Sequence, residues 1–343
     1  MNKIGFAIVG CGMISKFHAN AIEALEDAYL AGVYDPVPAS MERASKLYGV
    51  PGFESMAALL ACEDVDAVCV CTPNGLHAPI AMQILNAGKH VVIEKPMALT
   101  LADADAIIAA AKKRNLCVCV ISQLRFSPAV QAVKKAVEDG MFGKIVSASL
   151  SMKYWRDEAY FASSGWRGTW KMDGGGALMN QGIHGVDLLQ YLVGPVKNLT
   201  ALCKTQTRPV EVEDSAVAIL EFANGAVGTL DAFTTCCPGY PRRLEICGDQ
   251  GSIVLQEEDI LRWDLPGKKP DLTSHGSAAA SDPSAISNAG HIRQLGNMVK
   301  AIRGEEALLV DAVEGRKPVE IILSIYESSD KGVSIALKGE SEA

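Results

Sequence analysis

Up to about residue 122 the chain alternates short apolar runs with longer stretches in which apolar residues recur at helical spacing. This alternation indicates buried parallel strands joined by crossover helices. The predicted strands are Ile4–Val9, Leu30–Tyr34, Ala67–Cys71, His90–Ile93 and Cys117–Ile121. The predicted helices are Ile14–Leu25, Ala39–Tyr48, Pro79–Asn86 and Leu101–Arg114. The pattern therefore predicts an α/β fold that begins with a doubly wound parallel sheet.

From about residue 144 apolar and polar residues alternate over longer runs, as in strands with one buried face. The predicted strands are Ile145–Lys153, Leu199–Gln206, Asp214–Phe222, Ala226–Thr234, Arg243–Cys247 and Ser252–Leu255. Turn signals at Asn224-Gly225 and Asp249-Gln250-Gly251 favour hairpins. We expect a large, mostly antiparallel open sheet, with helices at Pro128–Asp139 and Gly182–Leu192 covering one face.

A length of 343 residues and a hydrophobic content of 49% favour two domains. The change of pattern places the doubly wound domain at residues 1–122 and an α+β domain at 123–343. The Ser/Ala-rich stretch 273–288 has few large apolar residues and indicates a loop. Such a loop either closes over a site or meets a partner subunit, and the residues do not decide between the two.

Charge and hydropathy exclude several classes of partner. Lys and Arg number 32 against 40 Asp and Glu, a net charge of -8, which gives no electrostatic footprint for nucleic acid or an anionic membrane surface. The first residues lack the pattern of a secretory signal, and no apolar run is long enough to span a bilayer. We expect a soluble, cytoplasmic protein that acts on a small molecule.

The ten cysteines fit a reducing compartment. Six lie in apolar strand-like runs: Cys69, Cys71, Cys117, Cys119, Cys203 and Cys247. Residues two apart on a strand share a face, so each Cys-x-Cys pair is expected to project into one packed layer. There is no C-x-x-C pair, and the spacing to the His residues does not resemble a zinc site. We predict reduced core cysteines and no bound metal.

The first predicted strand runs into a glycine turn, Gly10-Cys11-Gly12-Met13-Ile14-Ser15. It fills the first two glycines of G-x-G-x-x-G and places the small Ser15 at the third, where helix and strand pack closely. Gly10 permits the tight turn, and Gly12 lets the backbone approach a pyrophosphate at the N-terminus of the next helix. Such turns also occur without any ligand, so the motif alone does not establish a dinucleotide site.

Asp35 ends the second strand, close to the usual spacing after the glycine turn of an acid that bonds ribose hydroxyls. A carboxylate there repels the 2′-phosphate of NADP, and Pro36-Val37-Pro38 follows it rather than an Arg. The alternative is a solvated Asp at a strand end. The predicted cofactor is NAD, bound by Gly10, Gly12, Met13, Ile14 and Asp35.

Two further strand ends carry polar clusters, where the crevice of such a sheet lies. They are Thr72-Pro73-Asn74 with His77, and Glu94-Lys95-Pro96. A Lys that follows an acid and precedes a Pro is poorly explained as surface decoration. The cofactor set therefore also includes Thr72, Pro73, Asn74, His77, Glu94, Lys95 and Gln123.

The segment Asp173–Asp187 combines three consecutive glycines with Asn180 and His184. Residues four apart on a helix share a face, so the carboxamide and the imidazole are expected to point into one cleft. A lone helical His is more often a core residue, whereas the triple glycine favours close approach of a ligand or of backbone.

Upstream, aromatic and Arg residues gather at Tyr154, Trp155, Arg156, Trp166, Arg167 and Trp170. Aromatic faces with Arg and Asn donors suit a polyhydroxylated ring, and ordinary core packing is the alternative. His291 is a further candidate for the sugar pocket, or else it begins a helix. The predicted substrate residues are Lys95, Tyr154, Arg167, Asn180 and His184.

The glycine turn, Glu94-Lys95-Pro96 and the glycine-rich segment ending in His184 together resemble the Gfo/Idh/MocA family of oxidoreductases. The likeness covers nearly the whole chain, including Glu314–Glu320 and Ile325–Ser328. It implies a Rossmann domain and an antiparallel α/β domain for substrate binding, whose open sheet supports homodimers or homotetramers. It also implies that Lys95 bonds the reacting hydroxyl or the nicotinamide ribose, and that His184 transfers the proton.

One departure narrows the expected substrate. Many members carry Asp four residues before the His, and this chain has Asn180, which hydrogen-bonds only as a neutral group. Acid–base work then falls on His184 and Lys95. We predict NAD-dependent hydride transfer to or from a secondary carbon of a pyranoside, keto-sugar or sugar acid. Two alternatives use the same residues: a glycoside-cleaving enzyme that oxidises its substrate transiently with NAD, and a non-catalytic NAD-sensing protein.

Overall fold

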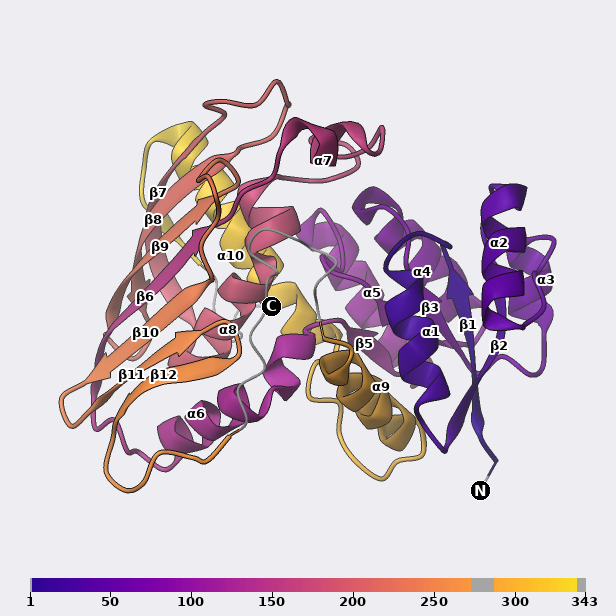
Figure 1. Cartoon of the computed structure of the whole chain (residues 1–343), viewed down its shortest axis with the longest axis horizontal. Coiled ribbons are helices and arrows are strands. Elements are labelled where there is room, and N and C mark those ends of the chain that lie inside the picture. Colours follow the sequence, from indigo (N-terminus) through magenta and orange to yellow (C-terminus); the bar gives the residue numbers. More distant parts are fainter. Residues whose placement is uncertain (1, 273–286, 338–343) are drawn as a thin grey trace. The chain divides into compact units, whose positions relative to one another are not determined.

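The computed structural model describes residues 2–272 and 287–337. The chain forms two compact units (Figure 1). The first unit comprises Met1–Gln123 and Asn288–Arg316, and the second comprises Leu124–Ser287 and Lys317–Ala343. The chain thus returns to its first unit late in the sequence, whereas the predicted division had a single boundary between residues 122 and 123.

The first unit is built on a five-stranded sheet with the order β2-β1-β3-β4-β5. All neighbouring strands run parallel, which confirms the predicted α/β sheet. The strands are β1 (Ile4–Val9), β2 (Ala28–Tyr34), β3 (Ala67–Val70), β4 (His90–Ile93) and β5 (Val118–Val120). The helices are α1 (Ser15–Glu23), α2 (Pro38–Tyr48), α3 (Met56–Ala61), η1 (Asn74–Leu76), α4 (His77–Asn86), α5 (Leu101–Arg114) and α9 (Ala289–Ile302).

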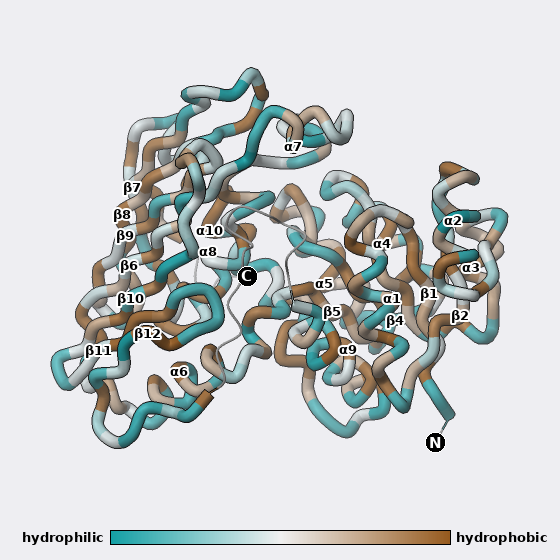
Figure 2. The backbone as a smooth tube through the Cα atoms, viewed as in Figure 1, coloured by the Kyte–Doolittle hydropathy of each residue, from teal (hydrophilic) through white to brown (hydrophobic). Residues whose placement is uncertain are grey.

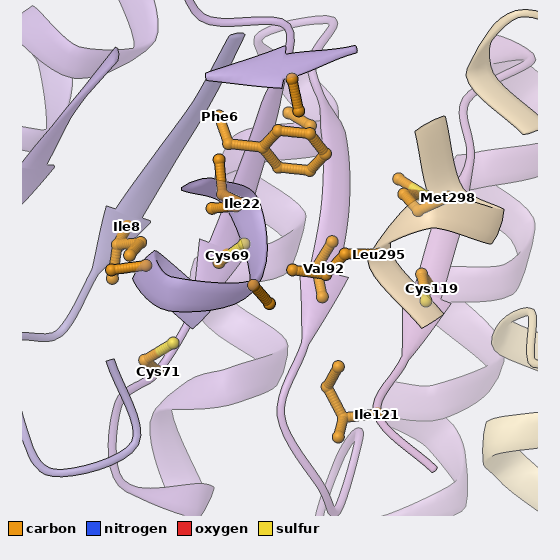
Figure 3. Packing of buried hydrophobic residues seen from close by; sticks show 14 of the residues in the cluster. Phe6, Ile8, Ile22, Cys69, Cys71, Val92, Cys119, Ile121, Leu295 and Met298 are labelled. Carbon is orange, nitrogen blue, oxygen red and sulfur yellow. The ribbon is translucent and has the colours of Figure 1, made fainter. Parts of the chain in front are cut away.

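One face of this sheet packs under α1 and α9. Figure 3 shows side chains from β1, β3, β4 and β5 meeting Leu295 and Met298 of α9. Parallel strands are buried on both faces, so this face needs helical cover beside α1. The apolar stripe of α9 supplies that cover, and this packing is the reason that 288–316 belongs to the first unit rather than to the predicted domain 123–343.

The Cys-x-Cys pairs occupy this same buried face. Cys69, Cys71 and Cys119 are buried in the cluster under α1 and α9, and all ten cysteines are free thiols. Burial raises the pKa of Cys69 and Cys71 well above the usual value, and that of Cys119 to about 12. These thiols therefore stay protonated, as predicted for core cysteines, whereas Cys117, Cys203 and Cys247 are only half-buried.

The second unit is built on an eight-stranded sheet with the order β12-β11-β10-β6-β9-β8-β7-β13. Only β6 and β9 run parallel, and both predicted hairpins are present. The strands are β6 (Ile145–Lys153), β7 (Val196–Lys204), β8 (Ser215–Phe222), β9 (Val227–Phe233), β10 (Arg243–Gly248), β11 (Ser252–Gln256), β12 (Asp259–Asp264) and β13 (Ile335–Ala336). The predicted large, mostly antiparallel sheet is confirmed.

The second unit also contains helical segments. They are η2 (Gln123–Phe126), α6 (Pro128–Glu138), α7 (Glu158–Ala162), η3 (Ala177–Gly182), α8 (Ile183–Val193) and α10 (Ala312–Lys331). α8 packs on β6 and β10, and α6 packs on α8, on the same side as α10 (Figure 1). Hydropathy changes repeatedly along these strands (Figure 2), because alternate residues point to the helices and away from them.

The predicted loop 273–288 lies, except for its last two residues, outside the described part of the chain, and its two alternative roles stay open. Among the described residues no helix is both long and apolar enough to cross a membrane.

Candidate active site

The turn between β1 and α1 has the geometry of a phosphate-binding loop. Gly10 has a φ of +94°, and a Cβ there would lie 2.6 Å from the carbonyl oxygen of Cys71. A Cβ at Gly12 would meet no atom within 4 Å, so its backbone faces open space. Ser15 is buried and donates a 2.6 Å hydrogen bond to the carbonyl of Gly12. The substitution at the third glycine position therefore stabilises the turn rather than breaking it.

Asp35 braces this turn from the end of β2. Its Oδ2 accepts the N–H of Cys11 at 2.8 Å, and its Oδ1 accepts the N–H of Val37 at 2.9 Å. Carboxylate oxygens have further acceptor capacity for ribose hydroxyls. The N-terminus of α1 begins after Ile14 with no side-chain cap, which leaves backbone N–H groups for a phosphate, while Met13 is exposed beside it.

The ends of β3 and β5 hold two unsatisfied polar atoms. Within the described chain, Thr72 Oγ1 and Gln123 Oε1 are buried without a hydrogen-bond partner. Buried polar atoms without partners in a protein suggest a missing ligand or water. Together with the open face of Gly12, these two atoms fit a dinucleotide, and both residues were in the predicted cofactor set.

Other residues of the predicted cofactor set make contacts within the protein. His77, the first residue of α4, lies between two carbonyls, with Nε2 2.8 Å from Thr72 O and Nδ1 2.7 Å from Pro96 O. Asn74 begins η1 after Pro73 and is buried. Glu94 is buried at the end of β4 and contacts His18 of α1. Lys95 is half-buried and is followed by a cis peptide bond to Pro96.

In the second unit, three backbone N–H groups of the glycine-rich segment converge on Glu213. Its carboxyl accepts from Gly176 at 2.9 Å and from Leu178 at 2.8 Å, and its carbonyl accepts from Ala177 at 3.0 Å. A Cβ at Gly176 would lie 2.1 Å from that carbonyl oxygen. At Gly175 a Cβ would lie 2.1 Å from the hydroxyl of Tyr326. The close approach predicted for these glycines is thus made by the chain itself.

Asn180 lies in η3, a turn of π-helix at the segment that Glu213 binds. The N–H of Gln181 bonds the carbonyl of Gly176, five residues earlier, at 3.3 Å. The prediction that Asn180 and His184 share one α-helix is wrong, because α8 begins only at Ile183. The anchoring of the segment by Glu213 accounts for the wider turn. His184 is half-buried in the first turn of α8.

The amide of Asn180 is held in one orientation. Its Nδ2 donates to Asp173 Oδ1 at 2.5 Å, and its Oδ1 accepts from Gln181 Nε2 at 3.2 Å. Gln181 also accepts from Arg156 Nε at 2.8 Å and donates to the hydroxyl of Tyr160 at 2.6 Å. A polar network therefore runs from Asp173 to Arg156, and the sequence pattern did not identify Asp173 or Tyr160 as its members.

The aromatic residues pair with guanidinium groups in separate contacts. Arg167 lies 4.3 Å from the ring centre of Tyr160, and Arg208 lies 4.5 Å from that of Trp155. Such stacking is a cation–π contact that leaves the N–H edges available. Among described residues, Arg167 Nε and Arg208 Nε and Nη2 are buried without a hydrogen-bond partner.

Of the other predicted aromatics, Tyr154 lies beside this network, with its ring centre 5.5 Å from the guanidinium carbon of Arg156. Tyr154 is buried, and its hydroxyl is hydrogen-bonded to Arg242; burial raises its pKa to about 12. Trp170 packs edge-on against Tyr326, with ring centres 5.3 Å apart. These two rings line a cavity of about 450 Å³ together with Glu213. The predicted Trp cluster is therefore not a single platform.

Burial makes the contribution of Glu213 to folding stability depend on pH. Desolvation raises its pKa from the usual 4.5 to about 7, although the hydrogen bonds from Leu178 and Gly176 oppose this. The folded chain then binds more protons than the unfolded chain between pH 4.5 and 7. The free energy of unfolding contributed by this group therefore falls as the pH rises through that window, by roughly 3 kcal/mol.

We expect Glu213→Gln to remove this pH dependence, because the amide does not titrate, and to reduce stability at acid pH. Urea unfolding of both proteins at intervals from pH 4.5 to 8 measures the difference. A constant difference between the two curves across the window would show that Glu213 does not titrate there.

Comparisons with known proteins cover both units. Residues 4–122 match the oxidoreductase family with an NAD-binding Rossmann fold, and residues 130–254 match the GFO/IDH/MocA C-terminal domain. Levoglucosan dehydrogenase from Pseudarthrobacter phenanthrenivorans is 30% identical over 293 residues, 75% of each chain. Inositol 2-dehydrogenase from Rhizobium meliloti is 28% identical, over 74% of this chain and 76% of its own.

The same likeness extends to solved structures. WlbA dehydrogenase from Bordetella pertussis, crystallised with NADH and UDP-GlcNAcA, superimposes with a TM-score of 0.91 at 33% identity, over 99% of each chain. Its coverage spans the NAD-binding fold and the antiparallel sheet alike. The chain belongs to the Gfo/Idh/MocA family and is an NAD-dependent oxidoreductase of the sugar dehydrogenase type.

Proposed function

We propose that the substrate is a sugar acid, free or carried on a nucleotide, that is oxidised at a secondary hydroxyl or reduced at the corresponding keto carbon. The observation that carries this proposal is the set of buried guanidinium N–H groups without partners on Arg167 and Arg208. A buried cationic donor is costly unless an acceptor reaches it, and a carboxylate or phosphate is the strongest acceptor for a guanidinium. The relative crystallised with UDP-GlcNAcA supports the same substrate class.

The second unit also offers groups for a neutral sugar ring. Asn180, Gln181 and Arg156 form a fixed polar network, and Tyr160 presents an aromatic ring beside it. Side chains held by neighbours bind a ring without first losing conformational freedom. In this proposal the network orients the ring, and the guanidinium groups select its charge.

The chemical step needs a proton acceptor and a group that stabilises charge on oxygen. NAD, when bound, takes the hydride from the substrate carbon. His184 accepts the hydroxyl proton as the carbonyl forms, and Lys95 stabilises the oxygen as its charge develops. In the reverse direction His184 returns the proton. Gly10, Gly12 and Asp35, with Thr72 and Gln123, are proposed to hold the dinucleotide.

We expect Lys95→Ala and His184→Ala each to lower kcat by about 10²–10⁴-fold, the usual range for an acid–base group. The Kd for NAD should stay within about threefold in the His184→Ala protein. Stopped-flow measurement of NADH formation gives the rate, and fluorescence titration gives the Kd. Full activity in either variant removes that residue from the mechanism.

We expect Arg208→Met to lower the preference for UDP-GlcNAcA over the neutral UDP-GlcNAc by about 10–100-fold in kcat/KM, the effect of losing one or two hydrogen bonds to a charged group. Arg208→Lys, which keeps the charge, should retain part of the preference. The absorbance of NADH gives the rate of reaction with each of the two sugars. A neutral sugar as the better substrate of the unaltered protein would contradict the proposal, and release of an aglycone from a glycoside without net NADH would favour transient oxidation instead.

We also propose that the chain forms homodimers or homotetramers through the open face of the second sheet. This face exposes Leu202, Val217, Ile219 and Val227 on the three neighbouring strands β7, β8 and β9. Leu202 pairs directly with Val217 across β7 and β8, so the apolar side chains are contiguous. A contiguous apolar surface on a sheet is typical of a subunit interface, and a second copy presents a matching one.

We expect Ile219→Asp to shift the protein to a smaller species in light scattering after gel filtration, because the charge would be buried in the interface. Leu47→Asp on α2 is the matched control, since both side chains are 65% exposed and Leu47 lies in the first unit. A monomeric parent protein, or an unchanged mass for Ile219→Asp, would rule out this interface.

A further inference from the structure

A buried carboxylate stands directly before Lys95. Glu94 ends β4 with only 5% of its surface exposed, and its Oε1 lies 2.8 Å from Nε2 of His18 on α1. His18 is itself 0% exposed. An ionised carboxyl in such a place is strongly destabilising unless donors surround it, so this contact is a condition for burying Glu94 at all.

Burial and the contact between Glu94 and His18 determine the protonation state of each group. Although desolvation opposes it, the hydrogen bond from His18 and the proximity of His291 hold the pKa of Glu94 well below its usual range. Desolvation lowers the pKa of His18 despite the carboxylate beside it. At neutral pH Glu94 is therefore a carboxylate and His18 a neutral ring whose N–H lies on Nε2, facing Glu94.

The other carboxylate oxygen reaches the residue that the mechanism uses. Oε2 of Glu94 accepts the backbone N–H of Lys95 at 3.3 Å. On the far side of Lys95, the carbonyl of Pro96 is held 2.7 Å from Nδ1 of His77. The backbone on each side of Lys95 therefore contacts a buried side chain, Glu94 before it and His77 after it.

A third histidine comes from the late segment of the first unit. His291, in the first turn of α9, is 1% exposed, and its Nε2 lies 3.8 Å from Oε1 of Glu94. Its ring packs edge-on against His18 and lies beside Phe17. Among described residues neither ring nitrogen of His291 has a hydrogen-bond partner, so Glu94 is the polar group nearest to satisfying it.

We propose that His18 and His291 are positioning residues that act through Glu94. They hold its carboxylate in one rotamer, and that carboxylate in turn fixes the backbone from which the Lys95 side chain extends. The inference rests on the catalytic role proposed for Lys95. It gives the late segment 288–316 a role beyond packing, because α9 places His291 beside Glu94.

These three side chains are also of the types that bind zinc, and their ligand atoms lie within 4.8 Å of one another. The 2.8 Å separation of His18 and Glu94 is that of a direct hydrogen bond, with a proton between the two atoms. The geometry therefore favours a hydrogen-bonded cluster over a metal site.

The test compares His18→Gln, which keeps an N–H donor on a side chain of similar reach, with His18→Leu, which removes it. We expect His18→Leu to lower kcat by about 10–100-fold, since a displacement on the order of 1 Å at a reacting group has that effect. We expect the Kd for NAD to stay within about threefold, and His18→Gln to recover most of the lost kcat. ¹⁵N shifts of the His rings in the unaltered protein, without cofactor, should show the Nε2-protonated tautomer for His18.

His90 provides the matched control in the same unit. Its Nδ1 accepts the N–H of Cys117 at 3.0 Å, away from the turn, so His90→Leu should lower the unfolding temperature and leave kcat unchanged. Equal losses of kcat in His18→Leu and His90→Leu that follow the unfolding temperature would overturn the proposal. Equal behaviour of His18→Gln and His18→Leu, or stoichiometric zinc in the purified protein, would also overturn it.

A double-mutant cycle separates this inference from the proposed function. If His18 acts through Lys95, His18→Leu should lower kcat further by less than about twofold when Lys95 is already Ala. Fully additive losses would reject the positioning role while Lys95 remains catalytic. Full activity of Lys95→Ala alone would instead reject the proposed function. The same cycle with His291→Leu tests the second histidine.

Discussion

A carboxyl group removed from water must be given hydrogen-bond donors, and this requirement organises both units. In the first unit Glu94 is surrounded by His18 of α1 and His291 of α9, and its second oxygen holds the backbone of Lys95. In the second unit Glu213 binds consecutive N–H groups at the start of η3. The histidines beside Glu94 come from other helices, but each buried carboxyl also accepts a backbone N–H from the segment that carries the candidate chemistry. Stabilising the acid and positioning the site are therefore the same set of contacts.

The two buried glutamates differ in the groups that surround them and in the direction in which their pKa values shift. Glu94 faces imidazole rings, which keep it ionised at neutral pH. Glu213 faces backbone N–H groups and the hydroxyl of Tyr326, and desolvation leaves its pKa at about 7. Only the first can serve as a permanent charge. The second titrates near neutrality, so the charge beside η3, unlike that beside Lys95, changes with pH in that range.

The strands could be predicted from the sequence because each depends on a local period. β1, β4 and β6 begin and end where the apolar pattern does. The alternation of side chains between the two faces of a strand also correctly placed Cys69, Cys71 and Cys119 on one buried face. The place of α9 could not be predicted in this way. Its apolar stripe shows that it packs on another element, but no local pattern identifies the sheet within residues 4–120 as the partner.

The site shows the same limit. The glycine turn, the residues around Lys95 and the segment of His184 were found because their chemistry is written in neighbouring residues. Glu213 was missed because it accepts backbone N–H groups of Gly176 and Leu178, and backbone carries no sequence signal. Tyr326 was missed because its hydroxyl donates to Glu213, which is distant in the sequence. The three glycines were the one available clue. They were interpreted as allowing close approach of a ligand or of backbone, and in the structure Glu213 and Tyr326 approach them.

Asn180 illustrates how a substitution changes meaning once its neighbours are known. By itself, an amide rather than a carboxylate at residue 180 leaves no negative charge four residues before His184. The carboxylate of Asp173, however, accepts the amide N–H of Asn180 at 2.5 Å, so a negative charge remains one side chain further away. Because Gln181 occupies the amide oxygen, Asn180 cannot turn over to present its N–H elsewhere without losing both contacts. The amide therefore offers an oriented dipole but no proton acceptor for the reaction, which is consistent with the proton-transfer role proposed for His184.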